Sequence, residues 1–400
     1  MQDNSSTPTE GLKGAVYFPR DPGTGATVTE TARVMFDGVA STVRTTINRI
    51  EALLRQAAER STRPALPQVY VEYRHTNAGP LVMRSPVVGG RVTWSEDPKL
   101  RDLSGAVATG EIAVIIERMP FWEGPQDNLG VTTIKNGNVA PYNRLGLNPP
   151  QGTMPTPIKI TLTNSSGVSM DSRKFYFSVD STMGLSGTTH LLTGGAVSWG
   201  ANLTHSTRLW TLTIPASIIT AAKGSQMQVI AAFSSFVNSD IYLKASLWTN
   251  YSGLPIPTYI AGGDVYTQSR KLINLGSLPI PPDGVSTNDL SLVISGYSVT
   301  AGSATLSFVQ LTPAAGAVVI DQTGYNMLPN TSHVDDGSEA RSYHLSGSTR
   351  IGILRRSGGP LLVYPGQTNS LFCLFDEGTA YNSSRQMTLN VSYRPRYATI

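Results

Sequence analysis

The chain changes character at the stretch Gly110-Glu-Ile-Ala-Val-Ile-Ile-Glu-Arg-Met-Pro-Phe-Trp-Glu-Gly124. Ile112, Val114 and Ile116 recur at every second position, which is the period of a strand buried on one face. Pro120 ends the predicted strand because proline has no N–H to donate to a sheet. We therefore predict that this strand closes one domain and that the chain enters the next one after Pro120.

Charge is spread unevenly along the 400 residues. Residues 1–123 hold 14 Lys and Arg and 14 Asp and Glu, out of 31 and 27 in the whole chain. No glutamate lies between Glu123 and Glu339, although exposed helix faces favour Glu and Lys. The sequence therefore predicts a charged first domain and a weakly charged later part that contains no helices.

The first domain, residues 12–123, shows one helical pattern, from Ser41 to Arg60. Its apolar residues recur at spacings of three and four: Val43, Ile47, Ile50, Leu54 and Ala57. We expect Ser41 to cap the helix and Pro64 to stop it. Together with strands at residues 69–74, 86–93 and 110–118, the helix predicts a compact α+β domain.

The rest of the chain is predicted to be almost entirely β. Residues 124–157 are rich in Pro, Gly and Asn and predict an extended connector, with one strand pair at residues 130–134 and 138–142 as an open alternative. Residues 158–400 contain short β-patterned runs between turn residues, which is typical of a large antiparallel β-sandwich or jelly roll. One sandwich is the main prediction, and a split near Gln268 is the alternative.

Composition excludes several classes of function. The net charge is only +4, and no run of Lys and Arg with interleaved aromatic residues indicates nucleic-acid binding. The chain has no stretch of eighteen apolar residues, and Met1–Glu10 lacks the features of a signal peptide. We expect no nucleic acid as a partner, no membrane insertion and no export by the general route.

The sequence predicts no catalytic, cofactor or metal site. Cys373 is the only cysteine, so no intramolecular disulfide can form, and its apolar neighbours favour a buried side chain. The five histidines have no spacing typical of metal ligands, and the motifs of hydrolases, phosphate loops and zinc proteases are absent. The residues Asp335-Asp336-Gly337 leave a calcium loop open as an alternative to an ordinary surface loop.

Carbohydrate contact is the binding chemistry that the residues favour most. Sugars stack their C–H faces on exposed aromatic rings, and short polar side chains bind their hydroxyls. The candidate contact residues are Trp248, Asn250, Tyr251, Tyr259 and Tyr266. Aromatic residues at strand ends also cap hydrophobic cores, so a purely structural role is the alternative.

Several segments resemble tail and baseplate proteins of tailed bacteriophages. In the first domain these are Thr-Glu-Thr (29–31), the amphipathic helix, Val-Tyr-Val-Glu (69–72), Met-Arg-Ser-Pro (83–86) and Glu-Arg-Met-Pro-Phe-Trp-Glu-Gly (117–124). Later segments resemble the jelly-roll modules that such proteins carry: residues 155–164, 275–282, 364–369 and 392–397. The resemblance is diffuse and covers most of the chain.

The resemblance implies a role like that of a distal tail protein in a phage virion, made in the cytoplasm of a bacterial host. The first domain would assemble into a homo-oligomeric ring around the tail, and the sandwich would contact other baseplate proteins or a glycan of the host surface. We therefore expect a non-enzymatic structural protein. A carbohydrate-binding adhesin and a glycan-cleaving enzyme are the two alternatives.

Overall fold

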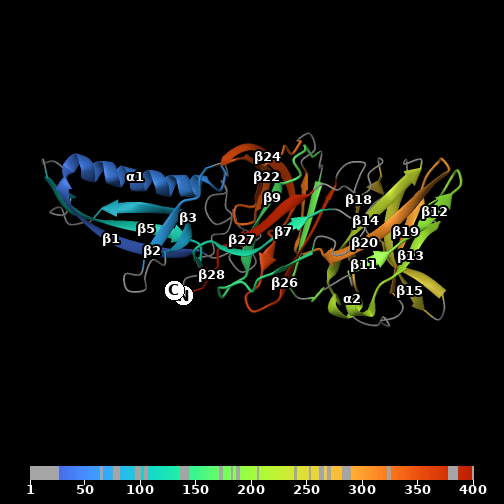
Figure 1. Ribbon diagram of the computed structural model, residues 1–400. Coiled ribbons are helices and arrows are strands. Elements are labelled where there is room, and N and C mark those ends of the chain that lie inside the picture. Colours follow the sequence, from blue (N-terminus) through green and yellow to red (C-terminus); the bar gives the residue numbers. More distant parts are fainter. Residues whose placement is uncertain are drawn as a thin grey trace. The chain divides into compact units, whose positions relative to one another are not determined.

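The computed structural model shows a mainly β chain in which the residues described form 28 strands and two helices (Figure 1). This confirms the predicted fold class. The structure describes residues 27–63, 66–74, 82–94, 101–102, 107–135, 144–170, 174–181, 183–185, 190–204, 207–237, 241–251, 254–260, 265–267, 272–281, 290–321, 326–376 and 386–398. The chain divides into two compact units. Unit 1 contains Met1–Gln126, Gly152–Met154 and Arg394–Ile400, and unit 2 contains Asp127–Gln151 and Pro155–Tyr393.

Unit 1 contains an antiparallel sheet. Its strand order is β1 (Val28–Val39), β5 (Val107–Arg118), β3 (Val82–Trp94), β6 (Trp122–Glu123) and β28 (Arg396–Tyr397), with β2 (Tyr70–Arg74) paired to β3 and β4 (Arg101–Asp102) paired to β5. Strand β5 is the one that the two-residue period predicted, and it ends before Pro120. Strand β1 lies at an edge and pairs, within the described part of the chain, with β5 alone.

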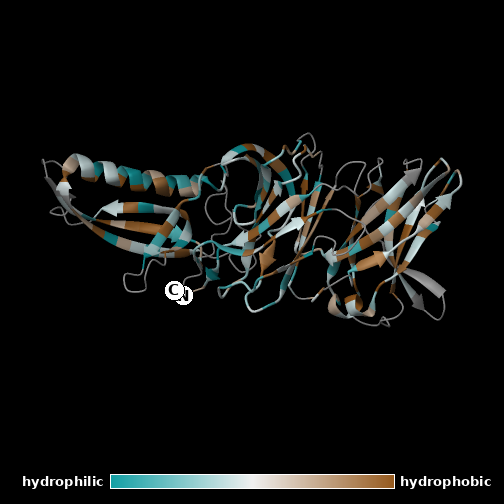
Figure 2. Cartoon of the chain, in the orientation of Figure 1, coloured by the Kyte–Doolittle hydropathy of each residue, from teal (hydrophilic) through white to brown (hydrophobic). Residues whose placement is uncertain are grey.

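Helix α1 (Ala40–Glu59) packs on one face of this sheet, as its apolar spacing predicted. Ile47 and Leu54 are buried in a cluster that also holds Ile112 of β5, and apolar and polar residues alternate along the helix in Figure 2. The prediction that Ser41 caps the helix was wrong. The N-cap is Val39, because the helix starts directly from the end of β1 and places Ser41 inside the first turn.

The last residues of the chain belong to unit 1, which the sequence did not predict. Strand β28 pairs with β6, placing Arg396 opposite Glu123 and Tyr397 opposite Trp122. The signal in the sequence is weak because the pairing involves only two residues on each strand, far below the length at which a two-residue period can be recognised. The predicted sandwich of residues 158–400 therefore loses its final segment to unit 1.

Unit 2 contains an eleven-stranded antiparallel sheet. Its order is β7 (Asp127–Ile134), β27 (Met387–Tyr393), β9 (Thr156–Asn164), β22 (Thr331–Asp336), β23 (Arg341–Ser346), β24 (Thr349–Gly358), β21 (Ala317–Asp321), β10 (Lys174–Asp180), β26 (Asn369–Asp376) and β8 (Arg144–Leu147), with β25 (Leu362–Val363) on β9. The sheet turns back on itself, since the N–H of Asn148 after β8 donates to the carbonyl of Leu129 in β7 at 2.8 Å. It surrounds a core that includes Leu162, Phe175 and Cys373.

The structure differs from the predicted connector at residues 124–157. Strands β7 and β8 lie inside that range, and β9 begins before it ends. The strand expected at residues 130–134 lies within β7, and the partner expected at residues 138–142 lies outside the described residues. The signal for β7 is weak because one of its faces is solvated: Leu129 is buried, whereas Val131 is 56% exposed. A strand with so few apolar residues has the composition of a linker, although its backbone pairs with β27.

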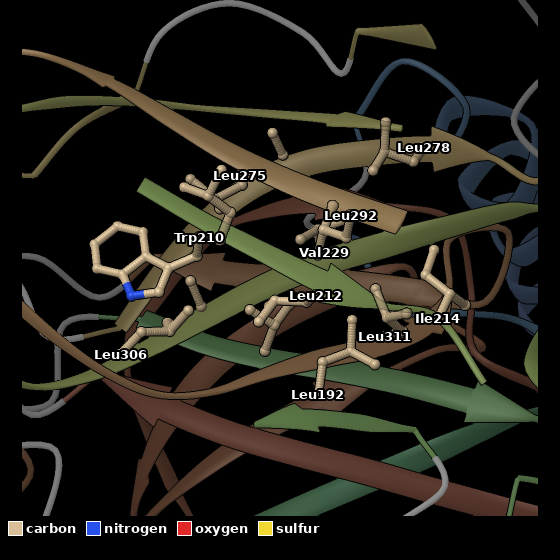
Figure 3. Close-up of a cluster of buried hydrophobic side chains, with 14 of the residues drawn as sticks. Leu192, Trp210, Leu212, Ile214, Val229, Leu275, Leu278, Leu292, Leu306 and Leu311 are labelled. Atoms are coloured by element: carbon tan, nitrogen blue, oxygen red, sulfur yellow. The ribbon is translucent and has the colours of Figure 1, made fainter. Parts of the chain in front are cut away.

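A two-sheet sandwich is inserted between β10 and β21. The inner sheet has the order β11 (Leu191–Thr193), β20 (Gly302–Pro313), β14 (Gln226–Val237) and β18 (Leu272–Pro279), with β12 (Ala196–Trp199) on β20. The outer sheet has the order β13 (Arg208–Thr213), β19 (Leu290–Tyr297), β15 (Tyr242–Tyr251) and β16 (Leu254–Ile260), with β17 (Val265–Tyr266) on β15. Figure 3 shows side chains of both sheets meeting in the core between them, among them Trp210, Val229 and Leu292.

This arrangement tests two predictions about the later part of the chain: the number of sandwiches and the absence of helices. The main prediction of one sandwich was wrong, because the region holds two large buried clusters, one in the eleven-stranded sheet and one in the inserted sandwich. The alternative split near Gln268 was wrong as well, because Leu247 before it and Leu275 after it lie in the same buried cluster. The expectation of no helix was wrong at α2 (Ala216–Ala221), a single short helix whose Ile218 and Ile219 are buried. It escaped prediction because six residues are too few to show a helical period.

The inner sheet is buried on both faces. Besides the core that it shares with the outer sheet, its Ile230 and Phe308 lie in a second cluster with Tyr176 of β10 and Leu374 of β26. The outer sheet has no comparable cluster on its second face among the described residues. On this second, outer face Tyr242, Tyr297, Thr211 and Thr213 are exposed, whereas Ser246, Val293 and Ser295 are buried. The inserted sandwich therefore presents part of the outer face of sheet β13-β19-β15 to solvent.

Candidate functional site

Alternation along β15 decides which side chains reach the outer face. Leu243, Ala245 and Leu247 point into the core and are fully buried. Successive side chains of a strand lie on opposite faces, so Tyr242 and Trp248 lie on the outer face, together with Lys244 and Ser246 between them. This outer face is the candidate functional surface, because it brings together aromatic, cationic and hydroxyl side chains.

Three tyrosines form a row across one end of this face. Tyr242 in β15 pairs with Tyr266 of β17 on one side and with Tyr297 of β19 on the other. The ring centroids of Tyr242 and Tyr266 are 4.8 Å apart, and those of Tyr242 and Tyr297 are 6.2 Å apart. The side chains are 37–40% exposed, so these residues, which we call the tyrosine row, present a continuous aromatic surface to solvent.

Two basic residues lie next to the tyrosine row. Lys244 is opposite Ser295 of β19, and Ser295 is opposite Arg208 of β13. No carboxylate of the described residues forms an ion pair with either cation, and the described outer-face positions of β13, β15, β17 and β19 contain no Asp or Glu. The face is therefore cationic as well as aromatic.

Trp248 is held by contacts within the protein. Its indole Nε1 donates to the hydroxyl of Ser246 at 2.7 Å. The guanidinium carbon of Arg208 lies 3.9 Å from the centre of the Trp248 ring, a cation–π contact. One ring face is thus covered by Arg208, and the indole N–H is already bonded, so Trp248 is a less open platform than the tyrosine row.

The structure separates the five residues that the sequence proposed as glycan contacts. Trp248 and Tyr266 share the outer face but lie at opposite ends of it, about 20 Å apart, since Trp248 is six positions beyond the Tyr266 partner Tyr242. Asn250 and Tyr251 lie in β15 and Tyr259 lies in β16, and their side chains are outside the described part of the structure.

Sequence reasoning missed Tyr242 and Tyr297. Both lie within the β-patterned region but away from the Trp248 segment, and only strand register brings them beside Tyr266. The available signal was the alternation from Tyr242 through Lys244 to Trp248, which marks one face of a strand. It predicts which residues of β15 share a face but not which strands lie next to β15.

The described carboxylates in unit 2 have structural partners. Asp180 accepts hydrogen bonds from the backbone N–H groups of Met183 and Leu185. Asp335 is buried, accepts from Arg356 Nε at 2.7 Å and accepts from the hydroxyl of Ser342 at 2.6 Å. Because protein donors occupy the oxygens of Asp335, the calcium loop left open by the sequence is not supported.

The described residues contain no cluster of three or more His, Cys, Asp or Glu that could hold a metal ion.

Three buried histidines have lowered pKa values. His333 and His344 are cross-strand neighbours with ring centroids 4.7 Å apart, although their sequence spacing gave no hint of contact. Burial lowers the pKa of both, and for His333 the neighbouring His344 lowers it further. Burial, with a smaller contribution from Arg144, lowers the pKa of His190 from 6.5 to about 4.

Cys373 is fully buried in the core of the eleven-stranded sheet, as its sequence setting predicted. Burial raises the pKa of its thiol because the core disfavours the charged thiolate. The thiolate is the nucleophilic form of cysteine, so this side chain is held in its unreactive form.

The fold and the surface together define a mainly β protein with one α+β unit and an inserted sandwich whose outer sheet carries an exposed aromatic and cationic face. No protein-family model matches the chain, and no curated protein matches it either. Among its described residues, no helix is both long and apolar enough to cross a membrane.

Solved structures of infectious bursal disease virus align with nearly the whole chain. The Gt strain structure has 9% sequence identity and a TM-score of 0.19, covering 99% of this chain and 85% of that chain. The crystal structure of the VP2 subviral particle has 10% identity and a TM-score of 0.19, covering 98% of this chain and 84% of that one. A TM-score of 0.19 is too low to establish a common fold, and nothing about this chain follows from the alignment.

Proposed function

We propose that this chain is a non-enzymatic structural component of a virus particle that self-associates through unit 1 and presents the inserted sandwich of unit 2 at the surface. The support comes from the chain itself. A mixed unit, whose edge strand β1 pairs on only one side among the described residues, is joined to a β unit. In that β unit Asp180 and Asp335 accept hydrogen bonds from the protein, and Cys373 is buried.

The observation that carries self-association is the edge strand β1. It is twelve residues long, and the five consecutive residues Thr31–Met35 are all exposed to solvent. Met35 is 77% exposed, Val39 is 58% exposed and Val34 is 38% exposed. Soluble proteins usually shorten, charge or cover such an edge, because its free N–H and C=O groups and apolar side chains pair with other strands. A twelve-residue edge strand that carries exposed Val34 and Met35 directly after exposed Arg33, and that pairs with no described strand other than β5, therefore fits a protein that completes its sheet by assembly.

The more specific proposal is a tailed-bacteriophage tail or baseplate protein similar to a distal tail protein. It follows from the sequence resemblance at residues 29–31, 69–72, 83–86 and 117–124, which the structure places in β1, near or in β2, β3, and β5 to β6. In this proposal unit 1 forms a homo-oligomeric ring around the tail, other baseplate proteins are neighbours, and the protein resides in the virion.

Electron microscopy of the purified full chain tests this proposal. Closed rings with one copy of the chain per repeat would support it. A field of single, unassociated molecules at every concentration would contradict the ring, and catalytic turnover of a glycan by the same preparation would contradict the non-enzymatic role.

Carbohydrate contact is the second candidate function, and the tyrosine row is the observation that favours it. Exposed aromatic rings on a face that also carries the exposed hydroxyls of Thr211 and Thr213 match the way in which proteins bind sugars. A glycan-array signal that is lost when Tyr242 is replaced by Ala would support this candidate. An unchanged signal would move the contact elsewhere.

A further inference from the structure

We propose that the tyrosine row and Lys244 bind an acidic oligosaccharide, with sugar rings lying on the tyrosines and a sugar carboxylate pairing with the lysine. The inference rests on the carbohydrate-contact candidate above and adds the chemical class of the ligand. It does not depend on self-association through β1.

The tyrosine row supplies the stacking surface. Its three rings come from neighbouring strands that are spaced by about 4.8 Å, so they lie side by side on one face of the sheet. The three tyrosines are 37–40% exposed, whereas the core tyrosines Tyr176, Tyr343 and Tyr393 are 2–5% exposed. Sugar rings present flat C–H faces that pack on such an aromatic surface.

Lys244 supplies the charge. It lies two positions from Tyr242 on the same face of β15, which places the two Cα atoms about 7 Å apart. That distance is within reach of a carboxylate carried by a sugar ring stacked on Tyr242. Arg208, the other cation of the face, is stacked on Trp248, so Lys244 is the cation that faces the tyrosine row without an aromatic partner in the described structure.

The chemistry of the surrounding face favours a sugar over a protein partner. Protein interfaces have an apolar centre with a polar rim. Here Lys244 lies beside the row, Ser246, Val293 and Ser295 are buried between the strands, and the exposed hydroxyls of the face are those of Thr211 and Thr213 on β13. Short hydroxyl side chains suit sugar hydroxyls, and the described face has no acidic group to repel a carboxylate.

The test compares two probes that differ only at C6 of each sugar. A short β-1,4-linked oligomer of glucuronic acid carries a carboxylate at that position, and the β-1,4-linked oligomer of glucose of the same length carries a hydroxymethyl group. Binding of each probe to the full chain is measured by titration calorimetry at low and at high salt. We expect the acidic oligomer to bind several-fold more tightly, and this preference to fall as salt screens the charge.

Three variants locate the binding. Tyr242→Ala should weaken binding of the acidic oligomer about tenfold or more, whereas Tyr242→Phe keeps the ring and should bind like the unchanged chain. Lys244→Gln should weaken it about two- to fivefold and remove the preference over the neutral oligomer. Lys223→Gln is the matched control, because Lys223 is an exposed lysine between α2 and the inner-sheet strand β14 and undergoes the same change.

The outcomes separate this inference from the function on which it rests. Equal binding of the acidic and neutral oligomers, lost in Tyr242→Ala, would overturn the acidic ligand and leave carbohydrate contact standing. Binding that falls in Lys244→Gln but not in Tyr242→Ala would overturn the stacked geometry in favour of charge alone. Absence of binding by both probes would overturn the acidic ligand and carbohydrate contact at this surface together.

Discussion

Glu123 in β6 and Arg396 in β28 form a buried ion pair, with Oε1 of the glutamate 3.6 Å from Nε of the arginine. Glu123 is 2% exposed and also accepts hydrogen bonds from Arg84 at 3.0 and 3.1 Å. The guanidinium of Arg396 lies 3.8 Å from the centre of the Phe121 ring. The end of the chain thus supplies a charge that unit 1 needs in order to bury Glu123.

Arg396→Ala should lower the free energy of unfolding of unit 1 by about 3–5 kcal/mol, because it leaves the buried Glu123 with only one of its two arginines. Chemical denaturation followed by the helix signal in circular dichroism reports on unit 1, since α1 holds twenty helical residues and α2 six. Arg63→Ala is the control: its ion pair with Glu59 is 73% exposed on the arginine side, and its loss should cost less than about 1 kcal/mol. Equal effects of the two variants would refute a structural role for the chain end.

Gly90 of β3 should not tolerate a side chain. Its φ is +148°, and an added Cβ would lie 2.3 Å from the carbonyl oxygen of Ile115 and 3.0 Å from Leu54 of α1. We expect Gly90→Ala to destabilise unit 1 by about 1–3 kcal/mol, measured by the same denaturation. Gly38→Ala is the matched change in β1, where the nearest atom would be Val43 Cγ2 at 3.9 Å. A Gly38→Ala chain that loses as much stability as Gly90→Ala would contradict this account.

The buried histidines should make unit 2 less stable in mild acid. Well above pH 6.5 their imidazoles are neutral in the folded and unfolded states alike, so they contribute no pH dependence there. Below that pH the unfolded chain takes up protons that buried His190, with a pKa of about 4, does not accept, and stability falls as the pH falls. His190 alone should cost up to about 3 kcal/mol between pH 6.5 and pH 4.

Urea denaturation of the full chain at a series of pH values, read from tryptophan fluorescence, measures this dependence. The structure describes all five tryptophans: Trp199, Trp210 and Trp248 in unit 2 and Trp94 and Trp122 in unit 1. His190→Leu, which keeps an apolar contact with Phe372, should flatten the dependence. A denaturation midpoint that is equally pH-dependent in both chains would show that His190 is not its source.

The features that the sequence predicted well are those carried by a local period. Helix α1 spans twenty residues with a continuous apolar stripe. In β5, Ile112, Val114 and Ile116 recur at every second position. Both elements could therefore be recognised from one segment of sequence. The mainly β character of the rest followed from short β-patterned runs between turns. Even the burial of Cys373 could be predicted, because its neighbours in β26 are apolar.

The features that the sequence did not reveal depend on contacts between distant segments. The pairing of Arg396 with Glu123 involves strands of two residues, and the contact of His333 with His344 depends on strand register. The tyrosine row has the same origin: Tyr266 was a candidate from its composition, whereas Tyr242 and Tyr297 join it only through pairing of β15 with β17 and β19. The period within one strand predicts which side chains share a face of the sheet, but it does not predict which strands lie next to that strand.

Sedimentation analysis of the full chain over a wide range of concentrations tests the proposed assembly through β1 most directly. We expect the unchanged chain to form a defined oligomer and Met35→Lys to remain monomeric, because a lysine on an exposed edge strand opposes pairing with another strand. Ile353→Lys is the matched control, since Ile353 lies in β24 of unit 2 and is 77% exposed, as Met35 is; it should assemble like the unchanged chain. A monomeric unchanged chain at all concentrations, or a Met35→Lys chain that assembles as fully as the Ile353→Lys chain, would contradict the account.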